Sequence, residues 1–85
     1  MTTEREIEAA LNLIEGMIEG LDDADTLPEG MSEDFGDVYE GYWGEKSRCF
    51  PVDLEKHREA IERFCADYGY ESPLPPRRGG GGGTP

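Results

Sequence analysis

The chain has 85 residues, of which 20 are acidic and 8 are basic, so its formal net charge at pH 7 is −12. A chain of this length forms one domain and has little room for the deep cleft of an active site. Its apolar runs are far shorter than the roughly 18 residues that cross a bilayer, and its N-terminus lacks a signal-peptide pattern. We therefore expect a cytoplasmic protein without a membrane segment.

The negative charge is concentrated in the first half of the chain. Residues 1–45 hold fourteen acidic residues and one basic residue, Arg5, whereas residues 46–85 hold six acidic and seven basic residues. Such clustering costs stability through self-repulsion, and it is tolerated for solubility or for a cationic partner. Nucleic acid is excluded as that partner, because its phosphates would be repelled.

A helix is predicted at the N-terminus. Thr3 and Glu6 form an S/T-x-x-E capping box, which satisfies backbone donors of the first turn. Apolar residues then recur at spacings of four and three, as one helix face requires. These residues are Ile7, Leu11, Ile14, Ile18 and Leu21. We expect Gly20 to end the helix in the left-handed conformation that glycine adopts readily.

An acidic loop is predicted next, over residues 22–37, with Pro28, Gly30 and Gly36 as helix-breaking residues. A calcium-binding EF-hand loop that starts at Asp23 would place Pro28 at the position of its required glycine. The acidic residues of this loop therefore predict no calcium site.

The segment 37–52 permits two interpretations. Aromatic and β-branched residues favour a β-hairpin, with strands at 38–43 and 48–52 around a turn at 44–47. The alternative is a helix N-capped by Ser32, with one shared apolar face. That face would carry Phe35, Val38, Tyr39 and Tyr42. We prefer the hairpin.

The last helix has clear signals at both ends. Asp53 is a good N-cap, and Gly69 suits the left-handed position after the helix, where Tyr70 could pack back onto the last turn. Between them an apolar stripe is expected. It consists of Leu54, His57, Ile61, Phe64 and Tyr68.

These elements predict a small α+β domain over residues 1–72, in the order helix, acidic loop, β-hairpin, helix. An all-α three-helix domain is the alternative. Residues 73–85, which contain prolines, two arginines and five consecutive glycines, are expected to form a disordered tail.

Catalytic and metal-binding patterns are absent from the sequence. The single histidine, His57, falls on an apolar stripe and is expected to pack there. Cys49, His57 and Cys65 are eight residues apart and include no C-x₂-C pair, so they do not predict a zinc site. Intracellular cysteines are usually reduced, so we expect two small, half-buried hydrophobic residues without a disulfide. We expect a protein that is not an enzyme and needs no cofactor.

Two groups of residues are candidates for binding a partner. The acidic group is Asp22, Asp23, Asp25, Glu29, Glu33, Asp34, Asp37 and Glu40. The aromatic group is Tyr39, Tyr42 and Trp43, since tyrosine and tryptophan are good interface anchors when exposed. Carboxylates on a rigid surface can occupy the lysine and arginine sites that phosphates use. The sequence therefore predicts a basic, nucleic-acid-binding protein as the partner.

In size and charge the chain resembles several small acidic inhibitors, although it shares no motif with them. These classes are nuclease immunity proteins, DNA-mimic proteins and phage-encoded inhibitors of bacterial defence, including anti-CRISPR proteins. The resemblance implies a non-catalytic inhibitor that occupies a basic surface. Two alternatives stay open: an adaptor or assembly subunit that forms a homodimer, and a small structural domain adapted to high salt.

Overall fold

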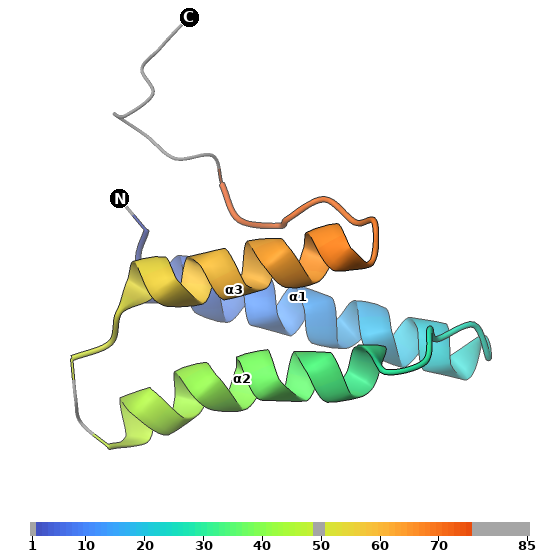
Figure 1. Cartoon of the computed structure of the whole chain (residues 1–85), viewed down its shortest axis with the longest axis horizontal. Helices are drawn as coiled ribbons and strands as arrows, with labels where there is room; N and C mark the ends of the chain where they lie inside the picture. Colours follow the sequence, from blue (N-terminus) through green and yellow to red (C-terminus); the bar gives the residue numbers. More distant parts are fainter. Residues whose placement is uncertain (1, 49–50, 76–85) are drawn as a thin grey trace, which may run out of the picture.

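Three α-helices make up most of the chain in the computed structural model, which describes residues 2–48 and 51–75. Helix α1 spans Glu4–Asp23, α2 spans Met31–Ser47 and α3 spans Leu54–Asp67. Helix α2 runs antiparallel to α1 and α3, and each helix contacts the other two (Figure 1). The described residues contain no strand, so the predicted α+β class is wrong and the fold is an all-α three-helix domain.

Helix α1 begins as predicted and ends later than predicted. Glu6 N–H donates to Thr3 Oγ1 at 3.2 Å and Thr3 N–H donates to Glu6 Oε1 at 3.1 Å, so the capping box is confirmed. The prediction that Gly20 ends the helix is wrong, because Leu21 still packs against the core and carries the helix on to Asp23.

The left-handed residue after α1 is Asp25, with φ of 60°. Two hydrogen bonds close this helix end: Asp25 N–H donates to Asp22 O at 3.0 Å, and Thr26 N–H donates to Leu21 O at 2.9 Å. This is a Schellman motif, in which glycine is the usual left-handed residue. An aspartate therefore stands where the backbone favours glycine.

Helix α2 replaces the predicted β-hairpin. Met31, Phe35 and Tyr42 are buried at helical spacings of four and seven, so a helix places all three in the core. The helix begins inside the predicted acidic loop, and its N-cap is Gly30, with φ of 84° and no side-chain cap, rather than Ser32. The strand propensity of the aromatic residues is overridden by this packing.

A chain of aromatic contacts joins α2 to α3. Phe35 lies 5.7 Å from Tyr39, and Tyr39 lies 6.1 Å from Trp43, between ring centroids. Phe35 also contacts Phe64 of α3 at 5.8 Å, and Phe64 contacts Tyr68 at 5.2 Å. The aromatic residues that suggested strands thus form part of the helical core.

Helix α3 is bounded as predicted. Asp53 accepts a hydrogen bond from Lys56 N–H at 3.1 Å, and Gly69 has a φ of 78°. Tyr70 N–H donates to Cys65 O at 2.8 Å, which completes a second Schellman motif. Tyr70 is 36% exposed, and the packing of its ring on the last turn stays a prediction.

A buried arginine of α3 binds the segment before α1 and the segment after α3. Arg58 is 4% exposed; it donates to Glu62 Oε2 at 2.9 Å, to Thr2 Oγ1 at 3.1 Å and to Pro75 O. Leu74, in the segment predicted as a tail, is buried. The remaining predicted tail, 76–85, lies outside the described residues.

The structure describes one of the two cysteines, Cys65. Cys49 lies outside the described residues, so the predicted absence of a disulfide stays a prediction. Cys65 is buried in the core, and this burial raises the pKa of its thiol. Cys65 therefore acts as a small hydrophobic residue that is fully rather than half buried.

The glycines of the helices allow a test of this fold. Gly36 lies inside α2 with free space around its Cβ position, so Gly36→Ala should raise the free energy of unfolding by about 0.5–1 kcal/mol. Gly69→Ala should instead lower it by about 1 kcal/mol, because its φ is positive. Urea unfolding of both variants measures these changes. A loss of stability in Gly36→Ala would contradict a helical α2.

Candidate functional site

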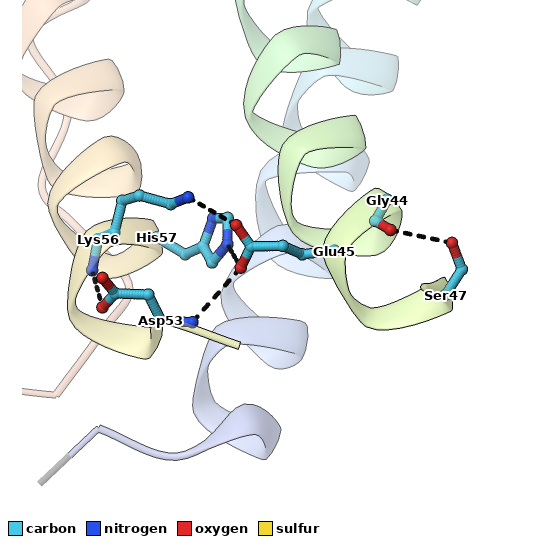
Figure 2. A network of polar contacts seen from close by, with 6 residues as sticks. All are labelled: Gly44, Glu45, Ser47, Asp53, Lys56 and His57. Atoms are coloured by element: carbon cyan, nitrogen blue, oxygen red, sulfur yellow. Dashed lines mark hydrogen bonds and ion pairs between the residues drawn. The ribbon is translucent and has the colours of Figure 1, made fainter. Parts of the chain in front are cut away.

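Two consecutive residues near the end of α2 bind the two neighbouring helices. Glu45 points toward α3, where Lys56 Nζ donates to its Oε2 at 2.6 Å and Asp53 N–H donates to its Oε1 at 3.4 Å (Figure 2). Nε2 of the buried His57 lies 3.0 Å from the same Oε1. The Glu45 carboxylate thus joins α2 to the first turn of α3.

Lys46 makes the corresponding contacts with α1. Its ammonium group pairs with Glu8, and lies 3.3 Å from Glu4. Tyr42 donates its hydroxyl hydrogen to Glu8 Oε2 at 2.7 Å, and Lys46 Nζ lies 5.3 Å from the centroid of Trp43. The chain has two lysines, and both are engaged in ion pairs within this end of the bundle.

These contacts shift the pKa values of the groups involved. Hydrogen bonds from Lys56 and then from His57 lower the pKa of Glu45 to about 2. Lys46, followed by Tyr42, lowers the pKa of Glu8, and Glu45 raises the pKa of Lys56. The ion pairs are therefore fully charged at neutral pH.

His57 has the packing role that the sequence predicts. Its ring contacts Tyr42 edge to face at 5.4 Å between centroids, and its Nε2 is engaged by Glu45. A buried ring with this polar partner is accounted for by the fold alone.

The eight predicted acidic residues are all exposed. Six of them lie around the α1–α2 connection, which is at the opposite end of the bundle from the α2–α3 connection (Figure 1). We call this group the acidic end. It comprises Asp22, Asp23, Asp25, Glu29, Glu33 and Asp34. Asp37 and Glu40 lie further along α2.

No basic side chain of the described residues forms an ion pair with the acidic end. Within residues 2–48 and 51–75, none of the eight predicted acidic residues forms an ion pair, and Asp34 is the one that accepts a side-chain hydrogen bond, from the Tyr68 hydroxyl. Arg5 is the sole basic residue before Lys46, and it lies in the first turn of α1, far along that helix from the acidic end. The negative charge of this end therefore faces solvent.

Three carboxylates of the acidic end occupy unfavourable positions. Asp22 and Asp23 lie in the last turn of α1, which holds no basic residue, so they face the negative end of the helix dipole. Asp25 adopts a left-handed conformation that favours glycine. Each of these placements lowers the stability of the free protein.

The predicted aromatic anchors lie in or against the core. Tyr42 is 1% exposed, and Tyr39 and Trp43 are half-buried. Trp43 Nε1 is buried without a hydrogen-bond partner in the described part of the chain. In the free protein the aromatic group is thus available to a partner only through the exposed edges of Tyr39 and Trp43.

Glu8, Glu45 and Lys46 were not predicted from the sequence as functional residues. A usable signal exists for Glu45: if the segment is a helix, Glu45 continues the spacing of Phe35, Val38 and Tyr42. The hairpin interpretation placed Glu45 and Lys46 in a turn and removed this signal.

No described helix has the length and apolar character needed to cross a membrane. Within the described ranges, no three side chains of the metal-ligating types gather into one site.

The chain matches no protein family, no curated protein and no solved structure. The evidence for the candidate site therefore comes from its geometry and charge alone.

Glu45 allows a test of the contacts between α2 and α3. Because its folded-state pKa of about 2 lies below its ordinary value of 4.5, it stabilises the fold above pH 4.5 and loses this effect as the pH falls toward 2. Glu45→Gln should therefore flatten the fall of unfolding free energy between pH 4.5 and 2. Urea unfolding across this range measures the slope.

The matched control is Glu40→Gln, which removes an exposed carboxylate of the same helix that forms no ion pair in the described part of the chain. This control should keep the steep acid dependence of the unsubstituted protein. Equal slopes in the two variants would show that Glu45 does not anchor α3.

Proposed function

We propose that this protein is a non-catalytic inhibitor whose acidic end occupies the basic, nucleic-acid-binding surface of a partner protein. The observation that carries the proposal is the lack of compensation at this end: six exposed carboxylates without an ion pair in the described residues, while both lysines pair at the other end. Such a surface attracts cationic partners and repels nucleic acid.

The positions of Asp22, Asp23 and Asp25 support a role in binding. Carboxylates at a helix C-terminus cost about 0.3–1 kcal/mol each, and a neutral or basic residue there would be more favourable. Residues that lower the stability of the free protein are expected where function requires them. General solubility would be served equally well by carboxylates at positions without this cost.

The proposed mechanism is displacement of nucleic acid. Carboxylates on helix ends are held by the fold, so they can pair with the lysines and arginines of the partner and release the same counterions that phosphates release. Binding should then weaken steeply as salt is added. Immunity proteins, DNA mimics and phage inhibitors of bacterial defence are classes of this physical type.

The experiment compares two double variants with equal charge. Asp22→Asn with Asp23→Asn should raise the free energy of unfolding by about 0.5–2 kcal/mol, because the dipole penalty is removed, and should weaken partner capture. Glu15→Gln with Glu71→Gln removes two exposed carboxylates that are not among the six of the acidic end and should leave capture unchanged. Capture from host lysate at low salt, with elution in a salt gradient, measures the difference.

The recovered protein decides between the candidate functions. A nucleic-acid-binding protein that duplex DNA displaces supports the proposal. Recovery of this chain alone would indicate the homodimer, and equal capture by both double variants would remove the acidic end from the binding surface.

A further inference from the structure

A groove runs along the outer side of α2 and α3. It consists of two adjoining hollows of about 580 and 410 Å³, whose walls share Asp37, Val38, Lys56 and Ala60. Along α2 and its C-cap residue, the lining extends from Asp34 to Arg48, about 21 Å at a rise of 1.5 Å per residue. Its length is therefore that of a helix of about four turns.

The groove lies on a different face of α2 from the contacts with α1. Tyr42 and Lys46 reach α1, whereas Gly41, Gly44 and Glu45 line the groove. At Gly44 a Cβ would meet no atom within 4 Å, so part of the groove wall is bare helix backbone. Such a wall allows the close approach of another helix.

The groove combines an apolar floor with acidic edges. The half-buried Val38 and Ala60 supply the apolar surface, and the buried Phe64 lies at its base. Lys56 and Glu45 neutralise each other, which leaves an excess of carboxylates over arginines. The carboxylates are Asp34, Asp37, Glu40, Glu59 and Asp67, and the arginines are Arg48 and Arg63. Asp34 belongs also to the acidic end, so the two surfaces are continuous.

We propose that this groove binds a basic amphipathic helix of the partner protein. Apolar side chains of that helix would pack on Val38 and Ala60, and its lysines or arginines would pair with the acidic edges. A fourth helix between α2 and α3 would complete a four-helix arrangement with α1 on the other side. A second copy of this chain fits less well, because it would bring carboxylates against carboxylates.

This inference rests on the proposed function, since it identifies the part of the partner that is bound. The probe is a synthetic helix of about 14 residues with leucine on one face and lysine on the other, added to the isotope-labelled full chain. Amide shifts should change at Val38, Gly41, Ala60 and Phe64. The same peptide with glutamate in place of lysine is the charge control and should not bind.

A variant that fills the groove tests whether the peptide binds there. Gly44→Leu directs a side chain into the groove from a position where a Cβ meets no atom within 4 Å. Gly16→Leu makes the same substitution at an exposed position of α1, where the Cβ also meets no atom within 4 Å. Both should fold at least as stably as the unsubstituted chain, because leucine favours helix over glycine. Gly44→Leu should weaken peptide binding at least about tenfold, and Gly16→Leu should stay within about twofold.

Equal peptide affinity of the two variants, or no binding of the lysine peptide, would overturn the groove proposal. The lysate capture then separates the two proposals. If Gly44→Leu captures the partner as well as the unsubstituted chain while the Asp22, Asp23 variant does not, the groove is wrong and the acidic end is right. If neither variant loses capture, the proposed function fails as well.

Discussion

This molecule has few basic residues, and their positions determine where its carboxylates are paired and where they stay unpaired. The chain has eight basic residues for twenty acidic ones, and both lysines lie where α2 ends and α3 begins. Ion pairing can therefore neutralise carboxylates at that end of the bundle, where Glu4, Glu8 and Glu45 are paired. The other end keeps its negative charge toward solvent, and this asymmetry is the reason that we propose it as a binding surface.

The same ion pairs hold α2 in place. Helix α2 contains three glycines and no side-chain N-cap, so its intrinsic stability is low. Its adjacent residues Glu45 and Lys46 bind α3 and α1 respectively, while Tyr42 packs between them. The ion pairs of the two lysines thus hold α2 against α1 and α3. Helix α2 in turn carries part of the acidic end and one wall of the groove.

The features predicted correctly from the sequence depend on residues that are close together in the chain. The capping box at Thr3, the N-cap at Asp53 and the left-handed Gly69 are determined by neighbouring residues, and the exposure of the acidic residues follows from their charge. The conformation of α2 was predicted wrongly, because aromatic residues and glycines give an ambiguous local signal. Packing of Met31, Phe35 and Tyr42 against two other helices decides it. The Glu45 and Lys46 contacts depend on that helix and could not be predicted without it.

The central claim is that the charge of the acidic end is uncompensated and destabilises the free protein. It is tested most directly by the free energy of unfolding as a function of sodium chloride concentration, for the unsubstituted chain and for the chain with neutral residues at Asp22 and Asp23. Screening should stabilise the unsubstituted chain as salt rises, and the neutralised chain clearly less. A stability that falls with salt, or parallel curves for the two proteins, would contradict the claim.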